Sequence, residues 1–185
     1  MEDHEIIELF WSRSESAIAE TDRKYGPLCR QIAVNILHNT EDAEECVNDT
    51  YFGVWNAIPP QRPVVFSAFL CRIARNQALK KYEHVHAAKR NGNCTLPLSE
   101  LEEMLVSPEN MDETLDAACV GKCISDFLRM SKRETRNVFL RRYWFCDSIP
   151  QLAASFGMSE SRVKSLLYRT RKKLADYLRK EGFTL

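Results

Sequence analysis

The sequence predicts an all-helical protein made of two small domains that a flexible linker joins, and three observations predict this fold. Apolar residues recur at the spacing of one helix face along most of the chain, and no stretch alternates as a β-strand does. A polar, acidic stretch rich in turn-forming residues interrupts the pattern in the middle. Helical patterns on both sides of Gly157 close the chain as a helix-turn-helix. We therefore expect domains over residues 1–86 and 113–185, with the linker over 87–112.

The first domain is predicted to contain four helices, of which a short amphipathic one opens the chain. Apolar residues over 28–36 mark a second helix that directly follows Gly26-Pro27. Thr40 is expected to cap the third helix, because acids fill the turn after it, where the helix dipole favours them. The double proline at 59–60 ends this helix. The fourth helix, over about 66–83, has a polar, cationic side.

Helical spacing resumes near Leu115 in the second domain. Ser131, with Glu134 three positions later, is expected to cap the next helix as a capping box. Gly157 permits the left-handed backbone that ends a short apolar-faced helix. Ser159 is expected to cap the long cationic helix that follows it.

The last two helices have the form that a helix-turn-helix needs to place side chains in the major groove of DNA. The second of them keeps Val163, Leu166, Leu167 and Leu174 on an inner side, while its other positions are mostly polar and cationic. Contacts with DNA are expected from Ser159, Arg162, Lys164, Ser165, Tyr168, Arg169, Arg171 and Lys172. A surface hairpin with a merely solvated basic face is the structural alternative, which the motif alone leaves open.

The charges cancel over the whole chain but are segregated along it. Residues 1–57 hold 12 acids and 4 bases, and residues 58–90 hold 7 bases and 1 acid. Residues 91–121 hold 7 acids and no base, and residues 122–185 hold 15 bases and 6 acids. This pattern predicts that the basic blocks bind a polyanion while the acidic blocks face another partner.

The composition disfavours several classes of protein and site. No apolar run approaches the roughly 20 residues that span a bilayer, and the chain does not open as a signal peptide, so we expect no membrane insertion and a cytoplasmic location. The seven cysteines are an odd number without a C-x-x-C, which argues against a disulfide framework and a zinc ribbon. No motif orients a nucleophile or cradles a phosphate, so we expect no catalytic residue, metal or cofactor.

Four stretches together resemble a known family of bacterial proteins. They are Tyr25–Leu37, Asp42–Trp55, Phe66–Ala78 with its Arg-Ile-Ala-Arg-Asn core at 72–76, and Met158–Leu174. In this order, on both sides of a linker, they resemble the extracytoplasmic-function (ECF) sigma factors of RNA polymerase. The resemblance covers both predicted domains and implies a helical factor that directs promoter recognition, DNA opening and transcription initiation.

The resemblance also implies which partners each domain contacts. The acidic helix of the first domain would dock on the clamp helices of core RNA polymerase through Asp42, Glu45, Asn48 and Asp49. The next helix and the loop before it would contact the downstream element of promoter DNA through Phe66, Arg72, Arg75, Asn76 and Lys80. Asn76 would lie at a pocket for a flipped base. The second domain would read the upstream element and touch the polymerase flap, and an anti-sigma factor is implied as an inhibitory partner.

Some positions depart from the family's pattern, and two other functions stay open. Leu166 stands where the family usually has arginine, and prolines occupy the loop over 59–65, so the promoter preference does not transfer. One alternative function is a dimeric helix-turn-helix regulator that binds a palindrome without being a polymerase subunit. The other is a helical adaptor with no DNA role, whose binding would lack a steep salt dependence.

Overall fold

The computed structural model of the chain describes residues 1–88, 100–101 and 115–183. The chain divides into two compact units, Met1–Asn93 and Cys94–Leu185. Every regular element in the described ranges is a helix, which confirms the all-helical class. Within these ranges, no helix combines the length and the apolar content that a membrane crossing requires. Most of the predicted linker lies outside the described residues.

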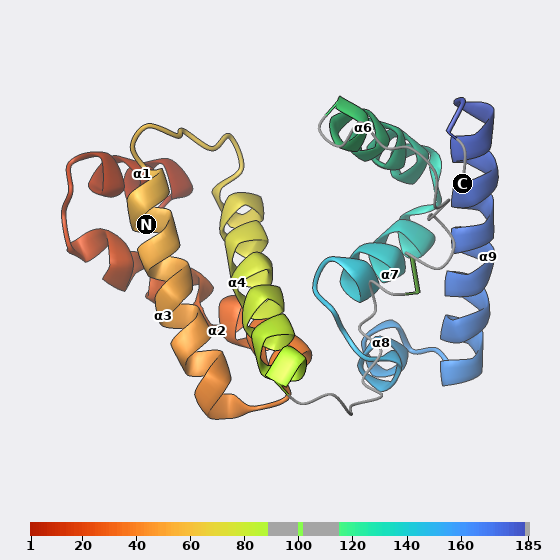
Figure 1. Ribbon diagram of the computed structural model, residues 1–185, viewed down its shortest axis with the longest axis horizontal. Helices are drawn as coiled ribbons and strands as arrows, with labels where there is room; N and C mark the ends of the chain where they lie inside the picture. Colours follow the sequence, from red (N-terminus) through yellow and green to blue (C-terminus); the bar gives the residue numbers. More distant parts are fainter. Residues whose placement is uncertain (89–99, 102–114, 184–185) are drawn as a thin grey trace. The chain divides into compact units, whose positions relative to one another are not determined.

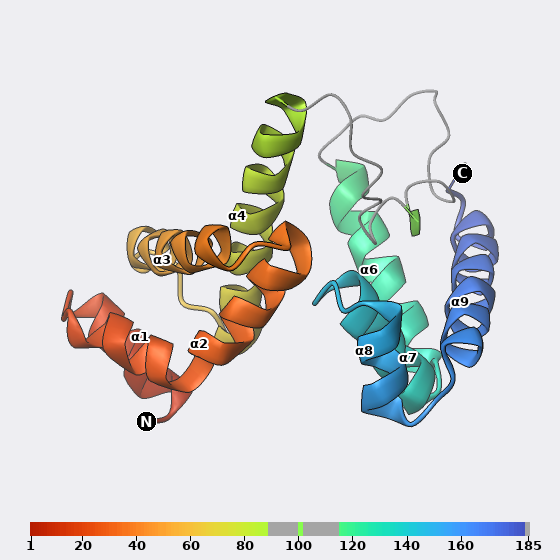
Figure 2. The ribbon, with the colours of Figure 1, turned by 90° about the horizontal axis from the view of Figure 1, so that it is seen from below.

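The first unit is built from α1 (Asp3–Trp11), α2 (Ser16–Leu37), α3 (Thr40–Ala57) and α4 (Phe66–Ala88). α2, α3 and α4 pack against one another, and α1 contacts α2 and α4 (Figure 1, Figure 2). Their apolar faces meet in one core, in which Phe10, Ile32, Val54 and Phe66 are fully buried. The centroid of the Phe66 ring lies 6.1 Å from that of Phe10 and 5.9 Å from that of Tyr25.

α2 begins much earlier than the sequence predicts, because the helix continues through Gly26 and Pro27 instead of starting after them. Proline removes one backbone hydrogen bond from a helix interior. Side chains bridge this weakened turn: the Asp22 carboxylate accepts hydrogen bonds from Arg30 Nη2 at 3.0 Å and from the Tyr51 hydroxyl at 2.7 Å. A Cβ at Gly26 would lie 2.4 Å from Asp22 Oδ1, so the glycine leaves room for that carboxylate.

Two predicted helix caps are displaced by one residue. Asn39 caps α3, since its Oδ1 accepts a hydrogen bond from the backbone N–H of Asp42 at 3.0 Å, and Thr40 is the first helical residue. Lys132, not Ser131, precedes α7. The Ser131 hydroxyl instead donates to the carbonyl oxygen of Phe127 at 2.9 Å, at the end of α6, so the predicted capping box does not form.

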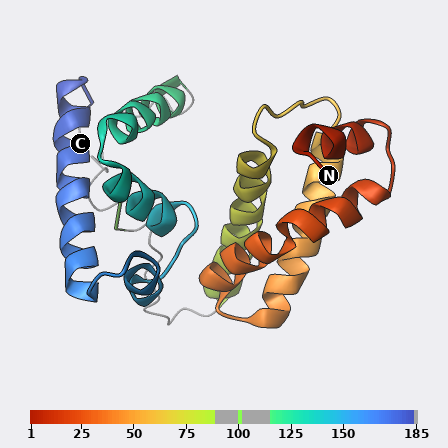
Figure 3. The same ribbon diagram turned by 180° about the vertical axis from the view of Figure 1, so that it is seen from behind.

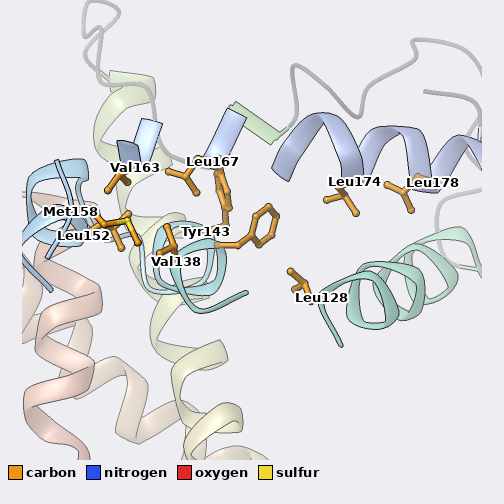
Figure 4. Packing of buried hydrophobic residues seen from close by; sticks show 10 residues of the cluster. Leu128, Val138, Tyr143, Leu152, Met158, Val163, Leu167, Leu174 and Leu178 are labelled. Carbon is orange, nitrogen blue, oxygen red and sulfur yellow. The ribbon is translucent and has the colours of Figure 1, made fainter. Parts of the chain in front are cut away.

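The second unit contains α6 (Leu115–Met130), α7 (Arg133–Tyr143), α8 (Ile149–Phe156) and α9 (Glu160–Lys180). α9 packs on α6, α7 and α8, and α7 packs on α8. Figure 3 shows the same helices from behind. Figure 4 shows the buried side chains that fill the space between them: Leu128, Val138, Tyr143, Leu152, Met158, Val163, Leu167, Leu174 and Leu178.

The helix-turn-helix forms as predicted from α8, a glycine turn and α9. Gly157 adopts φ 60° and ψ 37°, the left-handed conformation that ends α8. Ser159 Oγ accepts a hydrogen bond from the backbone N–H of Arg162 at 3.2 Å, which confirms it as the cap of α9. A capping box between Ser148 and Gln151 begins α8, with hydrogen bonds of 3.3 and 2.7 Å.

A fully buried acid fixes the connection from α7 to α8. The Asp147 carboxylate accepts a hydrogen bond from Arg141 Nε at 2.5 Å. Its backbone N–H donates to the carbonyl oxygen of Arg141 at 3.0 Å, and its own carbonyl oxygen accepts from Arg142 Nη1 at 2.9 Å. Since a buried charge needs a partner, these bonds hold the turn that leads into α8.

Gly157→Ala should lower the free energy of unfolding by about 1–2 kcal/mol, because alanine is strained in the left-handed region. Gly121→Ala is the matched control and should raise it by about 0.5–1 kcal/mol. Gly121 lies inside α6, and a Cβ there meets no atom within 4 Å. Urea unfolding followed by circular dichroism compares the variants with the parent. Equal stability of the two variants would contradict the backbone assignment at the turn.

Candidate nucleic-acid and protein interfaces

The outward side of α9 carries most of the residues predicted to contact DNA. Burial of Val163, Leu167 and Leu174 turns the rest of the helix toward solvent. The exposed residues are Ser159, Arg162, Lys164, Ser165, Tyr168, Arg169 and Lys172. Four of them line a shallow concave patch: Lys164, Ser165, Tyr168 and Arg169. Tyr168 keeps 56% of its surface exposed, so its ring and hydroxyl are accessible to a partner.

Arg171 is the exception among the predicted contacts of α9. It follows Leu167 by four positions and precedes Leu174 by three, so it lies toward the inner side of the helix. Its Nη1 donates to Glu100 Oε2 at 2.7 Å and to the Tyr143 hydroxyl at 2.6 Å. Only 16% of its side chain is exposed. The guanidinium of Arg171 is therefore bound within the second unit and is not exposed for a contact with DNA.

α4 of the first unit presents a second polar, cationic surface. Arg72, Asn76 and Lys80 are exposed and lie four positions apart, so they share one face, while Arg75 is half-buried beside them. The guanidinium of Arg72 lies 5.3 Å from the centroid of the Phe69 ring. Phe66, which the sequence groups with these residues, has no exposed surface, so it cannot stack on a base in this structure.

The loop before α4 is tied to α1 and ends in exposed apolar residues. Arg62 pairs with Glu8 at 2.5 Å, and its guanidinium lies 4.5 Å from the centroid of the Trp11 ring. Val64 is fully exposed and Val65 is more than half exposed. Both valines belong to the loop over 59–65, which the sequence resemblance places as a whole against the downstream element; the sequence did not distinguish them from the rest of that loop.

The acidic face of α3 divides into two parts. Lys81 of α4 bridges Asp42 and Glu45, with distances of 2.9 and 2.5 Å from Nζ, and reduces the negative charge at one end. Asn48 and Asp49 are exposed toward the other end. Next to them on the same helix is Phe52, which is 66% exposed and lines a concave surface between α2 and α3 together with Asn48.

The sequence reasoning missed Phe52, although helical spacing contained the signal. Phe52 follows Asn48 by four positions and Asp49 by three, which places it on their face and outside the buried stripe of Val47, Tyr51 and Val54. An exposed phenylalanine beside carboxylates suits a partner that is both cationic and apolar.

A groove of about 790 Å³ lies between the end of α6, the start of α7 and α9. Its floor includes the apolar side chains of Phe127, Leu166 and Tyr177, and Met130 at its edge is 68% exposed. Its lining holds more cations than acids: the cations are Lys132, Arg162, Arg169, Lys173 and Lys180, and the acids are Glu134 and Asp176. This groove fits an apolar helix or loop with acidic neighbours.

The described residues offer little to metal or thiolate chemistry. No group of three or more His, Cys, Asp or Glu among them is placed to hold a metal ion. Burial raises the pKa of the Cys29 thiol to about 12 and the pKa values of Cys46 and Cys71 to about 11. These thiols therefore stay protonated near neutral pH.

Comparison with known proteins gives matches in both units. The family model of sigma-70 region 2 matches residues 22–86, and that of sigma-70 region 4 matches residues 132–174. A solved structure of CnrH in complex with the cytosolic domain of CnrY is similar, with 22% sequence identity and a TM-score of 0.45. The similarity covers 97% of this chain and 99% of that chain. No curated protein matches the chain.

High pH should destabilise the second unit through Tyr143. Burial of its hydroxyl and the nearby Glu100 carboxylate raise its pKa to about 12, although the hydrogen bond from Arg171 acts in the opposite direction. An unfolded tyrosine ionises near pH 10, so this stabilisation is complete below pH 10 and is lost between pH 10 and about 12. The shift of about two units corresponds to roughly 3 kcal/mol.

Urea unfolding of the parent and of Tyr143→Phe between pH 8 and 11.5 measures this effect. The parent should be more stable by about 1–2 kcal/mol at pH 8, because the variant loses the hydroxyl's hydrogen bonds. That advantage should shrink as the pH rises. A difference that stays constant across the range would rule out Tyr143 as the titrating group.

Proposed function

We propose that this chain, which belongs to the sigma-70 family, acts as a sigma factor of the ECF group. In this role it binds core RNA polymerase, recognises two promoter elements and helps open the DNA. The observation that carries this proposal is the exposed polar and cationic side of α9, held outward by the buried stripe of the helix-turn-helix. The first unit adds a second polar, cationic surface on α4. It also adds a surface on α3 in which acidic and polar residues lie around the exposed Phe52.

We place the polymerase contact on the open end of α3. Asn48, Asp49 and Phe52 are exposed together, and the ring of Phe52 offers an apolar anchor at the centre of polar groups. Asp42 and Glu45 belong to the same surface, but Lys81 compensates part of their charge. The matching surface on the clamp helices would be cationic with an apolar residue facing Phe52.

The upstream promoter element would lie against α9. Residues near the start of a recognition helix come closest to base edges, which assigns sequence reading to Ser159, Arg162, Lys164 and Ser165. Tyr168, Arg169 and Lys172 follow on the exposed side and are suited to phosphate contacts. Arg171 is left out of this contact set, because its guanidinium is engaged by Glu100 and Tyr143.

The downstream element would lie against α4. Arg72 and Lys80 supply positive charge for phosphates, with Arg75 behind them, and Asn76 supplies donor and acceptor atoms for the edge of an unstacked base. Val64 and Val65 are exposed just before the helix and offer an apolar surface to such a base. Phe66 supports α4 from the core and is not part of this contact.

The groove between α6, α7 and α9 is the surface that we assign to the polymerase flap. Its apolar lining and the exposed Met130 suit an apolar partner. The lining cations that are not assigned to DNA, Lys132, Lys173 and Lys180, favour a partner with acidic flanks. An inhibitory anti-sigma factor and a cytoplasmic location complete the proposal, on the basis of the family alone.

Asp49→Arg should weaken binding to core polymerase by at least about tenfold, because the change removes an attraction and introduces a repulsion next to Phe52. Glu83→Arg is the matched control, since it reverses an exposed carboxylate on α4 of the same unit and should bind as the parent does. Titration of labelled protein with purified core enzyme gives the affinities. Tight binding of a palindrome by the chain alone, without polymerase association, would instead support the dimeric regulator.

Arg169→Ala should weaken promoter binding by the polymerase complex about equally for all upstream sequences and lower the salt slope by about 1. Lys164→Ala should change the preferred sequence instead, because it lies nearer the start of α9. Arg179→Ala is the control: it removes an exposed cation in the last turn of the same helix, one that pairs locally with Asp176 at 3.1 Å.

Fluorescence anisotropy over a range of salt concentrations and a set of mutated promoters separates these effects. Circular dichroism of each variant verifies that it is folded. If Arg169→Ala and Lys164→Ala bind every promoter as well as the parent does, α9 does not face the DNA. A binding constant that does not change with salt would favour the adaptor without a DNA role.

A further inference from the structure

Glu100 is held by α7 and α9, although it lies far before both helices in the sequence. Its carboxylate forms an ion pair with Arg142, and its Oε2 accepts hydrogen bonds from the Tyr143 hydroxyl at 3.0 Å and from Arg171 Nη1 at 2.7 Å. The neighbouring Leu101 packs against the apolar core of the second unit. These contacts join residues 42 to 71 positions apart.

The carboxylate compensates two cations that packing removes from water. The side chains of Arg142 and Arg171 are 12% and 16% exposed, and that of Glu100 is 28% exposed. The Nε atoms of both arginines are buried without a hydrogen-bond partner among the described residues. Removing this carboxylate would take from both largely buried guanidinium groups the acid with which they pair in the described part of the chain, which is strongly unfavourable. The contact is therefore much stronger than an exposed ion pair.

We propose that Glu100 fastens the linker to the DNA-reading unit, so that the tether between the two units ends at Glu100 and not at α6. This inference deepens the proposed function and rests on it for its consequence in transcription. Arg142, Tyr143 and Arg171 form the receptor for the carboxylate, and Leu101 adds an apolar contact beside it.

Binding of Glu100 to the second unit shortens the maximal length of the connection between the two units by a factor of about two. Ala88 ends α4, and about 12 residues separate it from Glu100, which span at most about 40 Å when fully extended. About 27 residues separate Ala88 from Leu115, the start of α6, and these span at most about 90 Å. A shorter tether raises the effective concentration of one unit near the other. It therefore narrows the range of distances between two promoter elements that both units can occupy.

Fluorescence energy transfer in the full-length chain tests the fastening directly. Dyes are attached at Arg23→Cys and Lys122→Cys, two exposed positions, after Cys94, Cys119 and Cys123 are changed to serine. Glu100→Gln and Arg171→Met should each lengthen the mean distance by on the order of 10 Å and broaden the distribution. The double variant should add nothing further, because both changes break one contact. Asp176→Asn, which breaks an exposed pair within α9, is the matched control and should leave the distances unchanged.

Two further measurements keep the proposal testable if a variant is unstable. Glu100→Asp keeps the charge on a shorter side chain and should give an intermediate distance. A purely steric role would instead leave Glu100→Gln, which has the shape of glutamate, at the distance of the parent. Circular dichroism confirms that the second unit is folded in each case. Identical distance distributions for the parent, Glu100→Gln and Arg171→Met would overturn the proposal, and this result requires neither polymerase nor DNA.

Transcription from promoters with different spacings tests the consequence. The parent should favour its best spacing over one that is longer by two base pairs, and Glu100→Gln should reduce this preference about threefold. The same spacing profile for both proteins would overturn the role of the tether. Failure of the parent to support transcription from any promoter would instead count against the proposed function.

Discussion

The fold of the second unit and its binding surface both depend on which side of α9 is removed from water. Val163, Leu167, Leu174 and Leu178 recur at helical spacing and are buried against the other helices of the unit. Because a helix that buries one side must present the other, the same stripe holds the opposite residues outward. Lys164 and Tyr168 protrude from a helix that its inner face holds in place. Contacts of α9 itself add to this orientation at Arg169, whose Nε donates to the carbonyl oxygen of Ser165 at 3.1 Å.

Local signals in the sequence were sufficient to predict the helices and the helix-turn-helix. The left-handed conformation of Gly157 and the cap at Ser159 depend on only a few neighbouring residues, so both can be predicted from the local sequence. The start of α2 was not predictable in this way. Pro27 disfavours a helix locally, and the bonds that Asp22 makes with Arg30 and Tyr51 cross from one turn or helix to the next. Such contacts between distant residues override a local preference of a few kcal/mol.

The exposure of individual side chains was harder to predict than the helices were. Helical periodicity shows which face of a helix a residue lies on, but it does not show which partners its side chain contacts. Phe66 and Arg171 belong to segments that were predicted to contact DNA, yet Phe66 lies in the core and Arg171 is bound by Glu100. Phe52 was missed as an exposed aromatic residue. The segregation of charge in the sequence also overstates the acidity of α3, since Lys81 comes from the basic block and pairs with Asp42 and Glu45. The side chains that are available to a partner are therefore those that do not already form such pairs within the chain.

Arg142 shows how polar contacts extend this organisation beyond the apolar core. Its Nη1 donates to the carbonyl oxygen of Asp147, just before α8, while its Nη2 pairs with Glu100. A planar guanidinium can make both contacts at once, whereas the single ammonium of a lysine lacks this fixed fork. Arg171 extends the set to α9 through the same carboxylate. The segment at Glu100, the turn into α8 and the helix that bears the proposed DNA-reading face are thus joined by a few charged groups. Since each is largely withdrawn from water, a change in one is felt by the others more strongly than a surface ion pair would allow.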